Sequence, residues 1–170
     1  MILKANRLIL RPWEEKDIPD IVEGLNNYNV SKWLALVKHP YAEADARDWI
    51  RRCQALKDAY EWAMDLNGKA IGGISLKIKG DKAEGGIWLS EKYHGHGYGR
   101  EAWDARNRYA FEAYPIDRLE SGYFIGNEPS RILHERSGYK PSHVQDLYSV
   151  AQGKLLKEQR LILRREDWRS

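Results

Sequence analysis

Residues 90–102 read SEKYHGHGYGREA, and their three glycines, Gly95, Gly97 and Gly99, fall at every second position. This spacing lets consecutive backbone N–H groups turn toward one side without clashes between Cβ atoms. The stretch follows a short apolar run and opens directly into a helical pattern over residues 100–114. Because a helix N-terminus presents free N–H groups and the positive end of its dipole, the stretch predicts a binding loop for a phosphate or pyrophosphate.

The loop differs from the two best-known phosphate-binding motifs. Arg100 stands where the G-x-G-x-x-G pattern of dinucleotide-binding loops has its third glycine. No Gly-Lys-Ser/Thr follows, so the lysine and hydroxyl that hold nucleotide phosphates and magnesium in a P-loop are missing. A nucleotide binder of that kind is therefore disfavoured. A flexible strand–helix connection without any ligand stays an alternative.

Hydrophobic patterning on both sides of the loop indicates an α+β domain. Asp17 is expected to cap a helix with Pro19 in its first turn, and a helix over residues 129–137 is expected to stop at Gly138. Helical spacing also predicts helices over residues 42–60 and 100–114, with a short helical piece over 31–36. Apolar or alternating runs predict strands over residues 7–12, 61–66, 70–79, 82–90, 117–125, 139–150 and 155–164.

The order of these elements constrains the sheet. Residues 61–90 are expected to form an antiparallel meander, because Asn67-Gly68 is typical of a two-residue hairpin turn. The strand–helix–strand order from residue 82 to residue 125 requires either a parallel neighbour or a splayed pair of strands. The last two strands are expected to form a hairpin around Gln152-Gly153-Lys154.

The composition fits one domain over residues 1–170 and excludes several classes of protein. Hydrophobic residues make up 42% of the chain and charged residues 31%, without a run of about 18 apolar residues, so no membrane contact is expected. A net charge of +3 is too balanced for a nucleic-acid-binding protein. The single cysteine, Cys53, excludes an intramolecular disulfide and lies in an apolar stripe, which predicts a buried, inert thiol. Without an export segment at its start, the chain is expected to be cytoplasmic.

The loop and its surroundings resemble the GNAT superfamily of acyl-CoA-dependent N-acetyltransferases. His94 to Gly99 fits the Q/R-x-x-G-x-G/A loop of that family, with His94 in place of the usual Gln or Arg. Further segments are similar to the branch that acetylates the N-termini of ribosomal proteins, although Gly99-Arg100 replaces its common Ala-Thr. These segments are Arg7-Leu8-Ile9-Leu10-Arg11 with Asp17, Ile87-Trp88-Leu89, residues 97–102, Asn127-Glu128-Pro129-Ser130 and Ser137-Gly138-Tyr139, so the resemblance covers about residues 7–140.

The resemblance implies a mixed, mostly antiparallel central sheet flanked by helices, with splayed strands at the acetyl-CoA site. It implies direct attack of an amine on the acetyl-CoA thioester in a ternary complex. The CoA pyrophosphate would lie against the N–H groups of residues 96–100, and a backbone N–H near Trp88-Leu89 would stabilise the oxyanion. The implied cofactor-binding residues are Trp88, Leu89, His94, Gly95, His96, Gly97, Tyr98, Gly99, Arg100, Asn127 and Ser130.

Two residues are candidates for proton transfer. His134 lies seven residues beyond Asn127, where the family often has a tyrosine, and an imidazole could donate a proton to the leaving thiolate; alternatively it is a half-exposed surface histidine. Glu84 stands at the start of the strand before the loop and could act as the base; alternatively it is a solvated hairpin residue. Glu91, Glu120 and water are the weaker candidates for the base.

The remaining expectations concern metal and acceptor. His94-x-His96 is at most half a metal site, and no third ligand suits it, so no metal is expected. The resemblance favours a protein or peptide N-terminus as the acceptor, because an α-amine has a pKa near 8 and is partly neutral at pH 7. A small-molecule amine, either an aminoglycoside or a polyamine, and a non-catalytic acyl-CoA-binding module stay alternatives. Both a monomer and a homodimer are compatible with the sequence.

Overall fold

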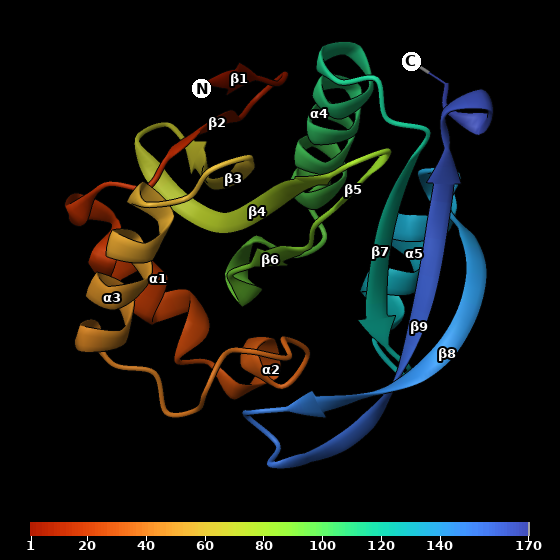
Figure 1. Ribbon diagram of the computed structural model, residues 1–170. Helices are drawn as coiled ribbons and strands as arrows, with labels where there is room; N and C mark the ends of the chain where they lie inside the picture. Colours follow the sequence, from red (N-terminus) through yellow and green to blue (C-terminus); the bar gives the residue numbers. More distant parts are fainter. Residues whose placement is uncertain (170) are drawn as a thin grey trace.

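A computed structural model describes residues 1–169, and a single long sheet runs through this part of the chain (Figure 1). The strand order is β1-β2-β3-β4-β5-β7-β9-β8, with β6 also paired to β4. Every pairing is antiparallel except that of β5 with β7, which is parallel. The strands are β1 (Leu3–Lys4), β2 (Ile9–Pro12), β3 (Ala59–Leu66), β4 (Lys69–Lys79), β5 (Lys82–Glu84), β6 (Ile87–Leu89), β7 (Arg118–Phe124), β8 (Lys140–Ser149) and β9 (Lys154–Arg164).

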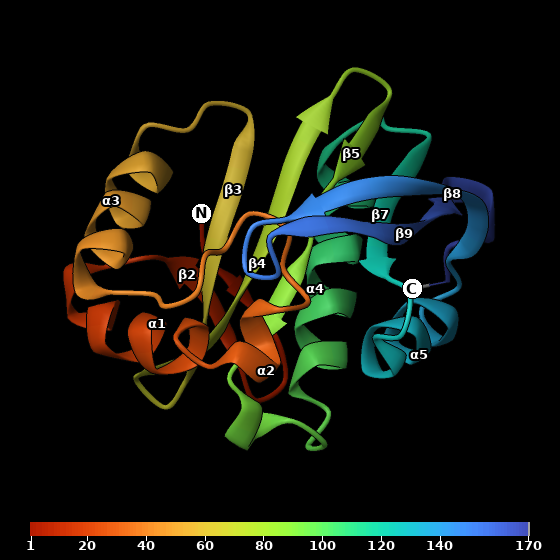
Figure 2. The same cartoon turned by 90° about the horizontal axis from the view of Figure 1, so that it is seen from below.

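Helices cover both faces of the sheet, which confirms the predicted mixed, mostly antiparallel α+β architecture. Helices α1 and α3 lie on one side of the sheet and α4 on the other (Figure 2). Buried residues of α1 and α3 form one apolar cluster, and those of α4 form a second with side chains from β2, β3, β4 and β7. No helix within the described chain is both long and apolar enough to span a bilayer. The helices are α1 (Ile18–Leu25), α2 (Tyr28–Ser31), α3 (Glu43–Gln54), α4 (Tyr98–Ala113) and α5 (Glu128–Arg136), with 3₁₀ turns η1 (Glu15–Asp17), η2 (Glu91–Tyr93) and η3 (Arg165–Asp167).

Three helical expectations need correction. The helix predicted over residues 42–60 ends at Gln54, because Tyr60 belongs to β3, where its ring stacks on Trp62 instead of continuing the helix. The short helical piece predicted over 31–36 lies earlier, as α2, which begins after Asn27. Asp17 precedes α1 as expected, but its carboxylate does not cap the helix: both oxygens accept from the Arg11 guanidinium at 2.8 Å.

The meander places a break in the sheet directly before the glycine loop. Asn67 and Gly68 adopt φ angles of 53° and 89° and form the predicted turn between β3 and β4. β5 pairs with both β4 and β7, whereas β6, which follows after Gly85-Gly86, pairs with β4 alone. Strands β6 and β7 therefore part after residues 84 and 120, so the structure contains both predicted alternatives: β5 has β7 as a parallel neighbour, and β6 and β7 splay apart.

Candidate functional site

The glycine loop leaves a run of backbone donors free at the start of α4. Gly95 and Gly97 have φ angles of 79° and 81°, a left-handed conformation that favours glycine. Gly97 is the N-cap residue of α4, and the first N–H bonded into the helix is that of Glu101, to the Gly97 carbonyl at 3.1 Å. No acceptor in the described chain takes the N–H groups of residues 95–100. An anion would satisfy several of them at once.

The turn between β1 and β2 holds this loop in place. The Glu101 carboxylate accepts from the backbone N–H groups of Arg7 and Leu8 and from Arg7 Nε at 2.8 Å. Arg7 Nη1 in turn donates to the His96 carbonyl at 3.0 Å, and its guanidinium lies 4.4 Å from the centre of the Tyr98 ring. Hydrogen bonds and an ion pair thus fix the conformation of the loop, which is not a flexible connection.

The polar side chains of the loop bind mainly to their own surroundings. His94 Nε2 lies 2.8 Å from the Leu89 carbonyl, and His96 Nδ1 lies 3.3 Å from the Tyr93 carbonyl. Arg100 pairs with Asp104 one helical turn later, at 2.7 Å. Within residues 1–169, no cluster of three or more His, Cys, Asp or Glu side chains could hold a metal ion.

Strand β6 presents its backbone, and not the Trp88 ring, to the space between the parted strands β6 and β7. The Trp88 ring stacks on Trp13 on the side of α1, with centroids 6.2 Å apart. The N–H of Ser90 donates to Ile71 of β4, so the N–H of Leu89, one residue earlier, points to the opposite edge, toward β7. Of Trp88 and Leu89, the two residues predicted to supply the oxyanion donor, Leu89 is therefore the one whose N–H can reach the space between β6 and β7.

Asn127 and Ser130 stand at the start of α5. The Asn127 side chain accepts from the Ser130 N–H at 3.5 Å, so Asn127 acts as a helix N-cap. The Ser130 carbonyl lies 2.7 Å from His134 Nδ1. The structure thus brings these two residues together with His134, beside the end of β7, and leaves their contact with a cofactor as a prediction.

His134 is buried, which contradicts the half-exposed alternative. Its side chain is 1% exposed and packs against the rings of Trp103, Tyr123 and Tyr139. Burial lowers the pKa of the imidazole to about 4, and the nearby positive charge of Arg106 acts in the same direction, although the bond to Ser130 opposes them. The imidazole is therefore neutral at pH 7, and it is not a ready acid in its resting state.

The three carboxylates proposed as bases all form ion pairs or accept hydrogen bonds from neighbouring side chains. Glu84, on β5, forms an ion pair with Lys79. Glu120, opposite it on β7, accepts from Lys82 at 2.8 Å and from Arg118 at 2.9 Å. The carboxylate of Glu91 accepts from Asn27 and Asn29.

Glu61 is a carboxylate that the sequence reasoning missed. It lies on β3 directly opposite Ser75 of β4, and the Ser75 N–H donates to the Gly86 carbonyl at 3.0 Å, so Glu61 shares a row of the sheet with the Gly85-Gly86 break. Burial raises the pKa of Glu61 to about 7, with no neighbouring charge responsible. The alternation over residues 61–66 shows only that this side chain shares a face with Ala63.

Two other features carry no chemistry. Burial raises the pKa of the half-buried Cys53 thiol to about 12, which agrees with an inert thiol.

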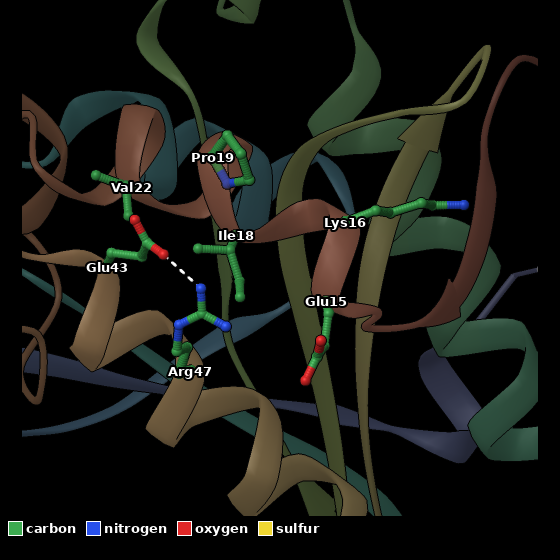
Figure 3. A pocket seen from close by; sticks show the side chains of 7 residues that line it. All are labelled: Glu15, Lys16, Ile18, Pro19, Val22, Glu43 and Arg47. Atoms are coloured by element: carbon green, nitrogen blue, oxygen red, sulfur yellow. Dashed lines mark hydrogen bonds and ion pairs between the residues drawn. The ribbon is translucent and has the colours of Figure 1, made fainter.

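A shallow hollow of about 520 Å³ opens between η1, α1 and α3, and none of the predicted site residues lines it (Figure 3). Its acidic Glu43 is paired with Arg47 at 2.5 Å.

The family model of the acetyltransferase (GNAT) domain matches residues 7–140. The chain belongs to the GNAT acetyltransferase family. YdaF of Bacillus subtilis (strain 168), named as a ribosomal N-acetyltransferase, is 32% identical over 147 residues, which are 80% of this chain and 80% of that protein. The GNAT family assignment therefore rests both on the domain and on a relative matched over four fifths of its length.

Solved structures show the same GNAT fold. An acetyltransferase of the GNAT family from Bacillus anthracis superposes with a TM-score of 0.85 at 24% identity, covering 98% of this chain and 99% of that chain. RimJ of Mycobacterium smegmatis, solved with a CoA-disulfide, superposes with a TM-score of 0.83 at 16% identity, covering 98% and 87% of the two chains. At these identities the likeness establishes the fold.

Proposed function

We propose that this GNAT acetyltransferase transfers the acetyl group of acetyl-CoA to the α-amine of a protein or peptide N-terminus. The observation that carries the proposal is the run of N–H groups over residues 95–100 that find no acceptor within residues 1–169, placed beside the parted strands β6 and β7. The loop takes the pyrophosphate, and the gap takes the pantetheine arm with its thioester. The complex of RimJ with a CoA-disulfide supports CoA as the ligand of this fold.

The reaction is a direct attack of the amine on the thioester carbonyl. The oxygen of that carbonyl gains negative charge as the C–N bond forms, and the Leu89 N–H at the splay is the donor assigned to it. Preorganised backbone donors of this kind lower the barrier because they need no reorientation during the reaction.

The amine must be neutral before it attacks. Glu84 keeps the role of base only if its carboxylate leaves Lys79. Glu61 is the second candidate, since its carboxylate has no hydrogen-bond or ion-pair partner among residues 1–169 and its pKa of about 7 suits a base at neutral pH. Water carries the proton if neither side chain does.

A protein N-terminus is favoured as the acceptor for two reasons. The relative YdaF is named as a ribosomal N-acetyltransferase. An α-amine with a pKa near 8 requires only a weak base, whereas a lysine amine near 10.4 is almost fully protonated at pH 7. The substrate class is therefore a polypeptide with a free N-terminus.

Calorimetry tests the cofactor. The protein is titrated with CoA and, separately, with ATP, which shares the adenine nucleotide but has no pantetheine arm. Binding of CoA without binding of ATP supports the assignment. Equal or tighter binding of ATP would favour the nucleotide binder that the sequence disfavours.

A panel of acceptors tests the reaction. CoA release is followed at fixed acetyl-CoA with peptides bearing free N-termini, the same peptides blocked at the N-terminus but carrying lysine, a polyamine and an aminoglycoside. Faster turnover of the free N-termini is expected. Faster turnover of the polycations would assign a small-molecule acceptor, and CoA binding without turnover of any amine would indicate a non-catalytic acyl-CoA-binding module.

A further inference from the structure

Ser121 connects the splay to the buried His134. Strands β5 and β7 are last paired at Glu84 and Glu120, and Ser121 is the next residue of β7. Its hydroxyl oxygen lies 3.1 Å from the carbonyl of Gly85, the residue that follows β5, and 2.8 Å from His134 Nε2. The hydroxyl therefore spans the point where the strands part and joins it to an imidazole away from water.

The contacts on the other side of the ring decide which nitrogen carries the hydrogen. Nδ1 lies 2.7 Å from the Ser130 carbonyl, which can only accept, so Nδ1 carries a hydrogen and donates it. Burial lowers the pKa of His134 to about 4, so at pH 7 the ring has no second hydrogen. Nε2 therefore keeps its lone pair and accepts from the Ser121 hydroxyl.

The hydrogen-bonded series from the Ser130 carbonyl through His134 and Ser121 to the Gly85 carbonyl can take up one more proton. In the resting state the Nδ1 hydrogen faces the Ser130 carbonyl, with the Ser130 hydroxyl farther away at 3.4 Å, and the Ser121 hydroxyl hydrogen has two acceptors, Nε2 and the Gly85 carbonyl. If Nε2 gains a proton, it donates to Ser121 Oγ, and the hydroxyl hydrogen turns to the Gly85 carbonyl. Every donor then has an acceptor without any movement of the backbone.

We propose that Ser121 and His134 form a proton relay that carries one proton from the attacking amine to the departing sulfur, a role that rests on the acetyl transfer proposed above. Once the C–N bond has formed, the amine nitrogen gives a proton to Ser121 Oγ while the hydroxyl hydrogen passes to Nε2. When the C–S bond breaks, Nε2 returns a proton through Ser121 to the thiolate. The enzyme ends in its starting state, and the thiol leaves neutral.

The surroundings of His134 make the protonated state short-lived. Arg106 of α4 and Arg160 of β9 both oppose a second positive charge, and the rings of Tyr123 and Tyr139 keep water away. A buried imidazolium that two arginines repel gives up its proton readily, which suits delivery to a thiolate. Ser121 is the catalytic residue of the relay, and His134 is a positioning residue that acts through it.

Steady-state kinetics of Ser121→Ala and His134→Gln test the relay. Each variant is expected to lower kcat by about 10- to 1,000-fold while leaving the KM for acetyl-CoA and the affinity for CoA unchanged. The double variant is expected to be no slower than the slower single variant, because both changes interrupt the same path. Ser137→Ala, which removes a buried hydroxyl without a hydrogen-bond partner in the described chain, is the control and should keep full activity.

Three outcomes would overturn the relay. These are an unchanged kcat in Ser121→Ala, effects of the two single variants that multiply in the double variant, and a parallel loss of CoA affinity, which would indicate disturbed packing. Mass spectrometry of the wild type with acetyl-CoA alone adds a fourth, since an acetyl group on Ser121 would make this residue a nucleophile instead. A wild type without any acetyl transfer would contradict the proposed function itself, whereas an active wild type with an equally active Ser121→Ala contradicts the relay alone.

Discussion

The glycine loop and the Ser121–His134 relay treat their hydrogen-bond donors in opposite ways. In the loop, the backbone N–H groups of residues 95–100 have no partner in the described chain and face outward at a helix N-terminus. In the relay, which is buried, both hydrogens of the resting state are committed at 2.7 and 2.8 Å. The first arrangement suits a ligand that brings its own charge, and the second suits a proton that only passes through.

Binding of the cofactor and transfer of the proton are thus separated in this molecule. Donors that wait for an anion tolerate water, because water satisfies them until the ligand arrives. A relay does not tolerate water, because water would offer the proton other paths. Changes in the loop should therefore act on CoA affinity, and changes around the relay should act on kcat or on the pH dependence of stability.

The largest effect is expected from branched side chains in the loop. Gly99→Val adds a Cβ whose nearest neighbour outside its own helix, within the described residues, is Ile87 Cδ1 at 4.0 Å, so the fold should persist while the phosphate path is blocked. Gly97→Val adds strain as well, because φ is 81° and the new Cβ lies 3.3 Å from Arg7. Calorimetry should show CoA affinity lower by about 100-fold or more, which is ~2.7 kcal/mol.

Gly80→Val is the control for backbone strain. Gly80 has a φ of 63° in the turn between β4 and β5, and a Cβ there meets no atom of the described residues within 4 Å. It should lose stability as Gly97→Val does but keep its affinity for CoA. An unchanged affinity for CoA in both Gly97→Val and Gly99→Val would mean that the loop does not bind CoA.

His134→Gln should change the response of stability to acid. The folded-state pKa of His134 is lowered to about 4 from 6.5, so the unfolded chain binds a proton first as the pH falls, and stability is lost between about pH 6.5 and pH 4. This contribution is up to about 3 kcal/mol. Urea unfolding at several pH values should show a flatter acid limb in the variant, and parallel curves would mean that the ring titrates normally.

Glu61→Gln should separate activity from stability. The raised pKa means that the wild type loses stability as the pH rises from about 4.5 to about 7, so the variant should be more stable above pH 7, by about 1 to 2 kcal/mol. If Glu61 is the base, kcat should fall by about 10- to 100-fold at pH 7, and the inflection near pH 7 should disappear.

Glu84→Gln is the matched variant for the choice of base. Like Glu61→Gln, it removes a carboxylate from this face of the sheet. Unlike Glu61→Gln, it also breaks an ion pair, the one between Glu84 and Lys79. A larger loss of kcat in Glu84→Gln than in Glu61→Gln would return the base to Glu84. Wild-type kcat in both would assign the proton to water.

Arg106→Met should have the smallest effect. The guanidinium is fully buried, lies 3.9 Å from the centre of the Trp103 ring, and makes no well-aligned hydrogen bond in the described chain, with the Tyr139 hydroxyl as its polar neighbour. An apolar side chain of similar length should stabilise the protein by about 1 kcal/mol in urea unfolding. A destabilised variant would mean that the cation is held by more than its ring contact.

Local patterns were enough to predict the parts of the site that lie on one segment. The spacing of Gly95, Gly97 and Gly99 predicts a loop that leads into a helix, and the structure has both. Asn67-Gly68 predicts the turn that aligns β3 with β4. In both places the backbone conformation depends on the residues themselves, so sequence reasoning works.

Contacts between segments could not be predicted in the same way. Ser121 meets His134 across 13 residues, and only the packing of α5 on β7 decides which face of the strand the helix covers. Glu61 gains its significance from the break at Gly85-Gly86, two strands away. The helix predicted to reach Tyr60 failed for a related reason: an aromatic ring at helical spacing also suits a strand, and stacking on Trp62 settles the choice.

The most direct test of the account is mass spectrometry of both reaction partners after incubation with acetyl-CoA. A peptide with a free N-terminus should gain one acetyl group on its α-amine, and the protein should gain none. Without the peptide, the protein should stay unmodified and acetyl-CoA should stay intact. An acetylated protein, or a peptide left unmodified while CoA binds, would contradict direct acetyl transfer at this site.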